Sequence, residues 1–400
     1  MHHPKGNDNM QIDFMNEDFV RNPFPVYKYM RENESISRFF LPNGVPAWLV
    51  TRYKDAAEIL NDSRFVTNFK NNEKQNLPLH REIVSQNLLS VEPSDHRRLR
   101  RLVQKAFTPR MVENLRGRIE DITNELLDKV QYKKEMKLIE DFAFPLPIHV
   151  ICEMLGVPTE DQDMFKRWSN IIMDSAMHPT EQADEGLKSF IDYLQVLIRK
   201  KRSALQEDLI SDLIRVEENG EVITEHEMYA LVFVLILAGH ETTVNLIGNG
   251  VVTLLEHPDQ KEKLLNQPDL IHSALEEMLR YNGPVEVSNV RWATEDIEFS
   301  GKKFRKGDMI IISLASANRD EEIFENADTF DITRKINNHV AFGKGVHYCL
   351  GAPLARLEGE IAITTLFQRM PNLRLKTDLD LLKWRKSMII RGLSEIPLLF

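Results

Sequence analysis

The stretch FGKGVHYCLG at residues 342–351 places a cysteine, one of only two in the chain, within a frame of glycines. Glycines at 343, 345 and 351 allow a backbone to approach a flat ligand, because no Cβ stands in the way. A helix is expected directly after Cys349, in APLARLEGEIAITTLFQRM, and the positive end of a helix favours a thiolate over a thiol. A thiolate held beneath a flat group suits an axial ligand of haem iron.

Two other interpretations of Cys349 are open. A lone cysteine is commonly an inert buried thiol. Alternatively, His347 and Cys349 could be two ligands of zinc, but zinc normally takes four and no other cysteine is near in the sequence. The six fixed positions of the stretch should match by chance roughly once in 10⁵ chains of this length. The spacing therefore favours the haem ligand.

The stretch resembles, at every fixed position, the cysteine loop F-G-x-G-x-H-x-C-x-G of the cytochrome P450 family, and the likeness continues into CLGAPLARLE, as in soluble bacterial members. The resemblance implies one haem-thiolate monooxygenase domain over residues 1–400. Its fold would be mainly α with small β-sheets, with haem b (iron protoporphyrin IX) between a central helix and the cysteine loop. Phe342, Gly343 and Gly351 would then contact the cofactor, and Cys349 would be the iron ligand.

Composition excludes several other classes of protein. The net charge is −10, which disfavours nucleic acid as a partner, and two distant cysteines form neither a disulfide framework nor a redox pair. The longest apolar run, LVFVLILAG at 231–239, is far shorter than the roughly 20 residues of a membrane span. The N-terminus lacks the apolar core of a signal peptide. We therefore expect a cytoplasmic protein without a membrane segment, and nothing demands more than a monomer.

Periodicity indicates helices over most of 111–275, with an exposed loop at 175–186, and another helix over 94–107 that has Ser94 as its N-cap. Strands are expected at 44–53, 285–291 and 309–314, and again in the C-terminal tail. No alternation of strand and helix runs through the chain, which argues against a doubly wound α/β fold.

Glu277 and Arg280 are three apart and share one helix face. Alone, such a pair is common on solvated faces. The resemblance implies a buried E-x-x-R pair completed by Arg334, a network that holds the cysteine loop in shape.

The central segment FVLILAGHETTVNLIG is apolar on nearly all sides and is expected to run through the core. Ala238 and Gly239 leave room for a ligand beside it. Glu241 and Thr242 have a structural explanation, a threonine bonded back to a carbonyl and a glutamate at a helix kink. The resemblance instead assigns them a catalytic role, the delivery of protons to oxygen. His240 could be a second axial ligand, but in the family this position usually faces away from iron.

The resemblance assigns the haem propionates to His96 and Arg100, which share a helix face, and to Arg291 and His347. A solvated basic face is the alternative for that helix.

The other cations there form a stripe of their own. Arg97, Arg101 and Lys105 are spaced by four, and Lys344 lies in the cysteine loop. In an acidic protein such a patch suits docking of an acidic electron carrier. No flavin or iron–sulfur segment is recognisable, so electrons are expected from a ferredoxin with its reductase, or from a flavodoxin. NAD(P)H would act only through them, and O2 would be the co-substrate.

The resemblance builds the substrate pocket from the 65–90 loop, from helices near 162–177 and 184–202 that form a mobile lid, and from the central helix, the strand after Pro284 and the C-terminal turn. The expected contacts are apolar, which indicates a lipophilic substrate, with core packing as the alternative: Leu88, Leu89, Leu235, Val285, Val287, Met388 and Ile389. Glu286 interrupts them. It could bind a cation, although solvent or a backbone partner is the simpler expectation. The likeness is greatest to members that oxidise macrolides and other polyketides, and terpenoids, steroids and fatty acids stay open.

Three rival functions remain. A peroxide-driven peroxygenase would have an arginine where Glu241 and Thr242 stand. A haem-thiolate isomerase or dehydratase would need no electrons. A haem-based gas sensor would need an output surface and has no use for Thr242.

Overall fold

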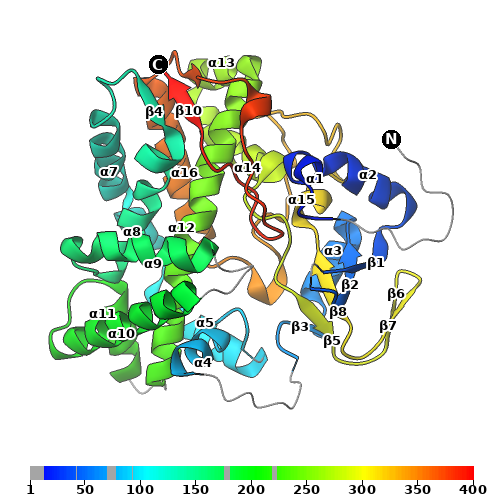
Figure 1. Cartoon of the computed structure of the whole chain (residues 1–400), viewed down its shortest axis with the longest axis horizontal. Coiled ribbons are helices and arrows are strands. Elements are labelled where there is room, and N and C mark those ends of the chain that lie inside the picture. Colours follow the sequence, from blue (N-terminus) through cyan, green and yellow to red (C-terminus); the bar gives the residue numbers. More distant parts are fainter. Residues whose placement is uncertain (1–12, 42, 70–77, 92, 175–180, 219–222) are drawn as a thin grey trace. The chain divides into compact units, whose positions relative to one another are not determined.

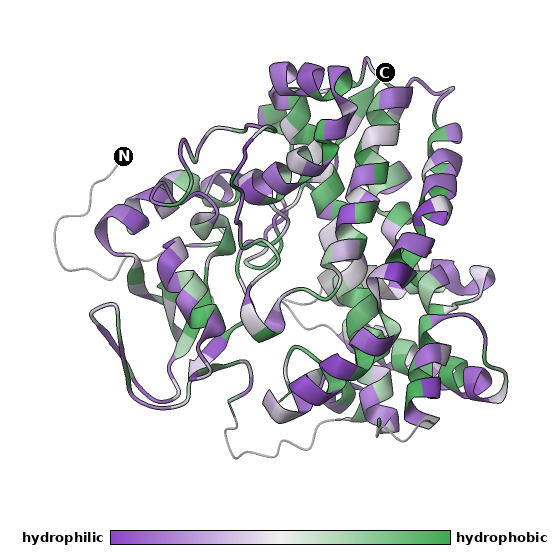
Figure 2. Cartoon of the chain, turned by 180° about the vertical axis from the view of Figure 1, so that it is seen from behind, coloured by the Kyte–Doolittle hydropathy of each residue, from purple (hydrophilic) through white to green (hydrophobic). Residues whose placement is uncertain are grey.

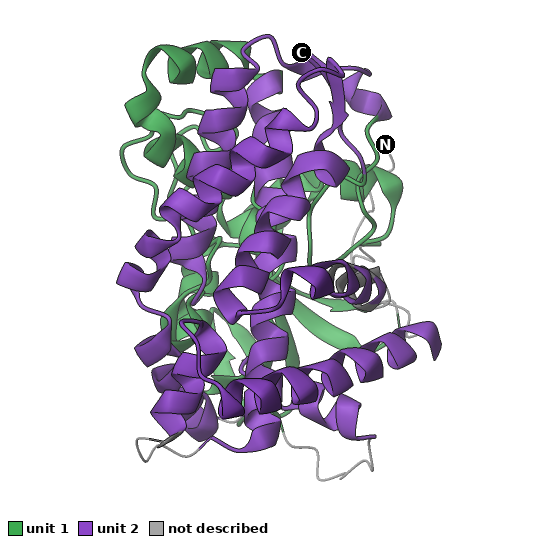
Figure 3. Cartoon of the chain, turned by 90° about the vertical axis from the view of Figure 1, so that its left-hand side faces the viewer, with its two compact units in different colours: residues 1–69, 256–349, 382–394 green, residues 70–255, 350–381, 395–400 purple. Residues whose placement is uncertain are grey.

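The structure is a computed structural model that describes residues 13–41, 43–69, 78–91, 93–174, 181–218 and 223–400. The chain divides into two compact units, each assembled from separate segments (Figure 3). Unit 1 comprises residues 1–69, 256–349 and 382–394, and unit 2 comprises residues 70–255, 350–381 and 395–400. The single domain expected over residues 1–400 remains a prediction.

Unit 1 contains a five-stranded sheet in the order β1-β2-β8-β5-β3 (Figure 1). The bounds are β1 Ile36–Phe40, β2 Pro46–Val50, β3 Phe65–Val66, β5 Arg291–Ala293 and β8 Met309–Ile312. β2 and β8 are parallel, with Trp48 opposite Ile310, and the other neighbours are antiparallel. The hairpin of β6 (Ile297–Phe299) and β7 (Lys302–Phe304) packs Phe304 edge-on against Trp48, with ring centroids 5.1 Å apart.

Unit 1 also contains helices. They are α1 Glu17–Arg21, α2 Phe24–Asn33, α3 Tyr53–Asn61, α13 Pro258–Asn266, α14 Ile271–Asn282 and α15 Leu314–Ala317, with 3₁₀ turns at Pro268–Leu270 and Gly345–His347. α3 buries Ala56, Ile59 and Leu60 in the same apolar cluster as Phe65 and Phe304. This packing fixes the helix beside the cysteine loop.

Unit 2 is mainly helical. Its helices are α4 Leu79–Ser85, α5 Pro93–Ala106, α6 Pro109–Asn114, α7 Arg116–Asp128, α8 Pro145–Leu155, α9 Gln162–Asp174, α10 Glu181–Ser203, α11 Leu209–Glu218, α12 Glu225–Glu256, whose last residue belongs to unit 1, and α16 Ala352–Arg369. Short turns add a π-helix at Ile139–Ala143 and 3₁₀ turns at Thr159–Asp161 and Leu379–Leu381. A small sheet in the order β4-β10-β9 joins Glu135–Lys137, Pro397–Leu399 and Arg374–Leu375.

Helix α12 is the core of unit 2, and hydrophobic residues predominate along it (Figure 2). It starts at a capping box: the backbone N–H of Thr224 donates to the Glu227 carboxylate at 2.8 Å, and the N–H of Glu227 donates to the Thr224 hydroxyl at 3.2 Å. By length and composition α12 could cross a membrane, but 72% of its most apolar window is buried within the protein, as in a core helix.

Several expectations from periodicity need correction. The strand expected at 44–53 is limited to Pro46–Val50, and Ser94 lies inside the first turn of α5 because the helix already includes Pro93. The expected loop at 175–186 is helical from Glu181 onward, and residues 175–180 lie outside the described part. Of the strand expected at 285–291, Val285 and Val287 form isolated bridges, to Ile390 and Ser313.

Candidate functional site

The cysteine loop of unit 1 is held by its own backbone. The N–H of Cys349 donates to the carbonyl of Phe342 at 2.9 Å, and the N–H of Gly343 donates to Val340 at 2.8 Å. Gly343 has φ +70°, a conformation that favours glycine. Cys349 is partly exposed and forms no disulfide, and α16 begins at Ala352 with Gly351 as its N-cap. Cys349 is thus a partly exposed residue near the end of the loop.

Gly345 was expected to lie against a flat ligand. In the structure its neighbours are residues at the end of α3. A Cβ at this position would lie 2.7 Å from Asn61 Oδ1 and 2.8 Å from the carbonyl oxygen of Leu60. Gly345 therefore lets the loop lie against the end of α3, and this contact accounts for the glycine by itself. That its missing side chain also serves a ligand stays a prediction.

Cys152, the other cysteine, differs from Cys349 in its burial. It is fully buried in α8, and burial raises the pKa of its thiol to about 12. A thiol in this setting stays neutral at physiological pH and serves as a core side chain.

The E-x-x-R network is present in unit 1. Arg280 donates to both Glu277 carboxylate oxygens at 2.7 and 2.8 Å, and Arg334 donates to the same oxygens at 3.1 and 3.2 Å. Arg280 also donates to the backbone carbonyls of Asn318 and Ala327. Glu277 and Arg280 are buried. The charges of Arg280 and Arg334 are therefore balanced by one shared carboxylate, that of Glu277.

Helix α12 of unit 2 is buried from Met228 to Leu254 except at Leu235, Leu237, Ala238, Gly239 and Thr242. Leu235, Ala238, Gly239 and Thr242 follow helical spacing and share one face. We call these four residues the α12 strip. It contains every α12 residue that the sequence predicted for ligand or substrate contact, and Thr242 is its one hydroxyl.

Glu241 lies off this strip. It is buried, and Asn245 donates to its backbone carbonyl at 2.8 Å and to its carboxylate at 3.4 Å. The Thr242 hydroxyl donates to the carbonyl of Ala238 at 2.8 Å, as the structural explanation requires. α12 is continuous through this point, so no helix break accompanies Glu241. The acid and the alcohol are therefore neighbours on different faces.

Two further α12 residues serve packing. A Cβ on Gly239 would come within 3.3 Å of Ile151 of α8, so this glycine accommodates a protein neighbour as well as sparing space on the strip. His240 is fully buried, and its ring lies edge-on to Phe144 with centroids 5.2 Å apart. His240 also lies 3.8 Å from a Glu241 carboxylate oxygen. These contacts put the imidazole within protein rather than on the strip.

The cations expected at the propionates lie in both units. In unit 1, Arg291 is buried and its Nε has no hydrogen-bond partner among the described residues, and burial lowers the pKa of its guanidinium to about 10. His347 is half-buried in the same unit. In unit 2, His96 is buried and Arg100 is half-buried. A buried guanidinium such as Arg291 is the group that an anionic ligand would stabilise.

The cations expected at a redox partner are all exposed: Arg97, Arg101 and Lys105 on α5 of unit 2, and Lys344 in the cysteine loop of unit 1. Arg98, between them in the sequence, is instead bonded to Glu227.

The candidate substrate residues differ in burial. Within unit 2, Leu88 is buried, Leu235 is half-buried, and Leu89 is 38% exposed. In unit 1, Met388 and Val287 are buried, Val285 is half-buried and Ile389 is 50% exposed. The buried members also fit ordinary core packing.

Glu286 was expected to meet solvent or a backbone partner, and the expectation of solvent is wrong. Its side chain is buried, and burial raises the pKa of its carboxyl, while the charge of Arg391 partly offsets this. Arg391 donates to Asn282 at 2.9 Å and to the carbonyl of Val20 at 2.8 Å.

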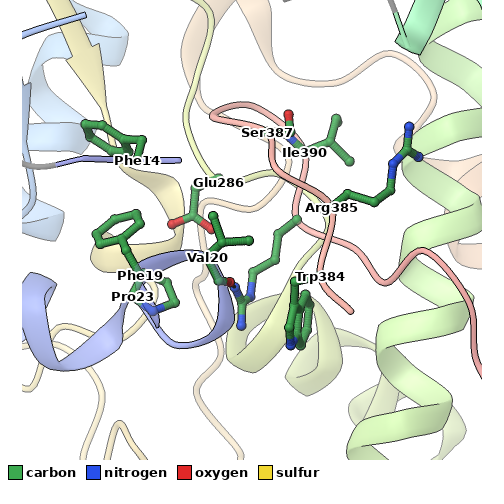
Figure 4. A pocket seen from close by; sticks show the side chains of 10 residues that line it. Phe14, Phe19, Val20, Pro23, Glu286, Trp384, Arg385, Ser387 and Ile390 are labelled. Atoms are coloured by element: carbon green, nitrogen blue, oxygen red, sulfur yellow. Dashed lines mark hydrogen bonds between the residues drawn. The ribbon is translucent and has the colours of Figure 1, made fainter. Parts of the chain in front are cut away.

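Glu286 also lines a recess of unit 1 (Figure 4). The other residues that line this recess are Phe14, Phe19, Val20, Pro23, Trp384, Arg385, Ser387, Ile390 and Arg391. None of them is a candidate substrate residue. The recess is therefore lined by chain neighbours of the predicted substrate residues: Glu286 lies between Val285 and Val287, and its N–H donates to the carbonyl of Ile389 at 2.8 Å.

Sequence reasoning missed two sets of polar contacts in unit 2. Asn245 beside Glu241 could have been found, because polar residues four apart on an apolar helix share a face. The contact of His80 and Arg81 with Asp184 bridges more than 100 residues. No local pattern predicts it.

These residues fit a thiolate-ligated haem. Cys349 supplies a sulfur donor, Arg291 a buried cation for a carboxylate, and the α12 strip an accessible, mostly apolar face. The zinc alternative lacks ligands: within the described ranges, no group of three or more His, Cys, Asp or Glu side chains could hold a metal ion.

Comparison with known proteins identifies the family. The family model for Cytochrome P450 matches residues 148–378. A cytochrome P450 of Bacillus subtilis (strain 168) is 46% identical over 389 residues, which cover 96% of this chain and 95% of the relative. The polyketide biosynthesis cytochrome P450 PksS of the same organism is 43% identical over 406 residues, covering 99% and 98%. The chain therefore belongs to the cytochrome P450 family of haem-thiolate monooxygenases.

Solved structures confirm the fold class. The Bacillus subtilis 168 PksS structure has a TM-score of 0.92 at 43% identity, covering 97% of this chain and 99% of that one. P450BioI in complex with an acyl carrier protein that bears hexadec-9Z-enoic acid has a TM-score of 0.89 at 40% identity, covering 96% and 99%. The expected mainly α architecture with small sheets is correct.

Proposed function

We propose that this chain inserts one oxygen atom from O2 into a lipophilic small molecule, by hydroxylation or epoxidation, with electrons from a separate protein. The α12 strip carries the proposal. It combines three apolar residues with the single hydroxyl of Thr242, next to the buried carboxyl of Glu241. A sensor or an isomerase has no need of that acid–alcohol pair.

A thiolate-ligated haem, when bound, supplies the reductive activation of dioxygen. Cys349 provides the thiolate, and His96, Arg100, Arg291 and His347 bind the two carboxylates. The remaining cofactor contacts come from small or flat residues, namely Phe342, Gly343, Gly351, Ala238 and Gly239.

Glu241 and Thr242 have the proton-transfer role. The Thr242 hydroxyl keeps free acceptor capacity while it donates to Ala238, so it can bind a water molecule or substrate oxygen on the strip. Glu241 is the carboxyl group beside it, and its proposed role is to pass protons to Thr242.

The substrate is proposed to be a polyketide or a related acyl chain. The name of PksS associates that relative with polyketide biosynthesis, and the P450BioI structure holds a fatty acyl chain on a carrier protein. The candidate contacts here are apolar, as such chains require: Leu88, Leu89, Leu235, Val285, Val287, Met388 and Ile389. Terpenoids and steroids share that requirement and belong in the same screen.

Electrons are proposed to come from a ferredoxin with its reductase, or from a flavodoxin, with NAD(P)H as the ultimate donor. The exposed cations Arg97, Arg101, Lys105 and Lys344 supply positive charge for an acidic carrier.

The first test is the absorption spectrum of the reduced protein with and without carbon monoxide. Wild type should show the long-wavelength Soret band of a thiolate ligand, and Cys349→His should lose it. Cys152→Ser is the matched control and should keep the band. A histidine-type band in wild type would overturn the assignment of Cys349.

The second test is a screen of polyketides, fatty acids, terpenoids and steroids, free and carrier-bound, for a change of haem spin state. Hits are then incubated with an electron-donor system or with peroxide alone. Product that forms better with peroxide alone would favour the peroxygenase instead.

A further inference from the structure

Two adjacent residues of α4 contact one carboxylate of α10, and both helices belong to unit 2 (Figure 1). The ring Nε2 of His80 lies 2.9 Å from Asp184 Oδ1, and Arg81 Nε donates to the same oxygen at 2.5 Å. The His80 side chain is only 12% exposed, whereas those of Arg81 and Asp184 are 46% and 32% exposed. The contact thus joins parts of the chain more than 100 residues apart.

Helix α4 has few other anchors. It has seven residues, and Ile83 is its one buried member. No side chain caps its N-terminus. A helix of two turns is unstable by itself and depends on tertiary contacts. The polar contact with Asp184 therefore adds to the burial of Ile83 in holding α4 in place.

Movement of α4 reaches two candidate substrate residues. Asn87 donates to the carbonyl of Val84 in α4 at 2.7 Å, and its Oδ1 accepts from the backbone N–H of Leu89 at 2.8 Å. Leu88 and Leu89 are therefore tied to the end of α4.

We infer that His80, Arg81 and Asp184 form a clasp that positions α4 against α10 and sets the rate at which a lipophilic molecule enters and leaves. The inference rests on the proposed function, because it takes α4 and α10 to border the substrate pocket. Opening of the clasp frees α4 together with Leu88 and Leu89. Closing it restores their packed positions.

The clasp depends on a charged carboxylate. Hydrogen bonds from Arg81 and then His80 hold the pKa of Asp184 below its usual range, so the carboxylate stays charged at neutral pH. Hydrogen bonds to a charged acceptor are stronger than those between neutral groups.

Other charges near the clasp are more exposed. Glu82 on α4 and Glu185 on α10 flank the contact in the sequence, and both are exposed. Salt screens exposed charges, and half-exposed Arg81 shares this sensitivity. Raised ionic strength should therefore loosen the clasp.

Asp184→Asn tests the clasp because it keeps the size of the side chain and removes its charge. Glu185→Gln is the matched control, an exposed carboxylate one residue away. Asp184→Glu retains the charge and serves as the conservative rescue variant. Hydrogen exchange of the full chain, measured at one fixed pH, reports on the backbone amides of α4 and of the first turns of α10. This readout is independent of haem and of activity.

In Asp184→Asn we expect these amides to exchange about two- to fivefold faster. The rescue and control variants should behave as wild type. Unchanged exchange in Asp184→Asn would overturn the clasp.

Entry is measured separately by stopped-flow binding of 4-phenylimidazole, a lipophilic azole that binds haem iron. We expect Asp184→Asn to bind it about two- to fivefold faster. Faster exchange with an unchanged binding rate would overturn the role in entry. A chain that binds no haem would refute the proposed function, and the exchange data would still decide whether the clasp exists.

Discussion

Asn245 donates its side-chain amide to the backbone carbonyl of Glu241 at 2.8 Å, and the same amide lies 3.4 Å from the Glu241 carboxylate. This contact holds the acid on a buried face of α12, whereas Thr242 lies on the α12 strip. Glu241 therefore has to turn away from Asn245 before it can serve a molecule on the strip. The proposed proton path needs a side-chain rotation, and Thr242 is its fixed end.

Thr242→Ala removes that fixed end. With any substrate that changes the haem spin state, we expect product per electron to fall about tenfold or more, with the missing electrons recovered as peroxide. Thr243→Ala is the matched control, because Thr243 is buried and donates to the carbonyl of Gly239 at 3.2 Å. Equal yields from the two variants would refute the proton-path role.

Glu277→Ala leaves Arg280 and Arg334 without their shared carboxylate. Because Arg280 is buried, we expect the free energy of unfolding to fall by about 3–5 kcal/mol, measured by urea denaturation. Glu298→Ala breaks the pair with Lys303, in which both side chains are more than 70% exposed, and should change stability by less than about 1 kcal/mol. Similar decreases in the free energy of unfolding of both variants would show that the buried network contributes no more to stability than an exposed ion pair.

Arg291→Met should stabilise the folded polypeptide but weaken its binding of haem. Burial lowers the pKa of Arg291 to about 10, so its charged form costs stability at neutral pH. That cost disappears only as pH rises through 10 towards the usual value for arginine. The variant should raise the unfolding free energy of protein prepared without haem by a few kcal/mol, or about 1.4 kcal/mol per pKa unit.

The rate of haem transfer to apomyoglobin tests the prediction that the variant binds haem more weakly. Loss of haem from Arg291→Met should be faster than from wild type, because a carboxylate partner is gone. Arg305→Met, at a side chain that is 69% exposed, should change neither quantity. Slower or equal haem loss from Arg291→Met would contradict a propionate contact.

Charge reversal at Arg97 and Arg101 should slow reduction by an acidic carrier about tenfold at low salt and flatten its salt dependence. Lys133→Glu, at another exposed cation of unit 2, is the control for net charge. Stopped-flow reduction by a ferredoxin measures both. If the double variant is reduced at the wild-type rate, docking does not use this stripe.

Local sequence patterns predicted much of the site. The cysteine loop, the Glu277–Arg280 pair and the helical spacing of Leu235, Ala238 and Thr242 depend on residues within one or two turns of each other. Such patterns report on one element at a time. For that reason the helical class, the buried central helix and the family could be predicted.

Contacts across distant elements could not be predicted in the same way. The burial of Glu286 results from packing beside segments of both chain ends, and Asp184 meets residues of α4 far away in the sequence. The polar composition of 181–186 indicated a loop, but Phe190 of α10 packs on Phe165 of α9, with centroids 5.1 Å apart. That packing stabilises α10 as a helix, and the helix includes its polar first residues against their local preference.

The fit between Gly345 and the end of α3 has a consequence for protein engineering. The loop at Gly345 lies close to the Leu60 carbonyl and the Asn61 side chain. This contact fixes the position of the loop relative to α3. The carbonyl cannot be altered by mutation, but position 61 can. Substitutions at Asn61 are therefore a way to shift the cysteine loop against α3, and they leave every residue of the cysteine loop intact.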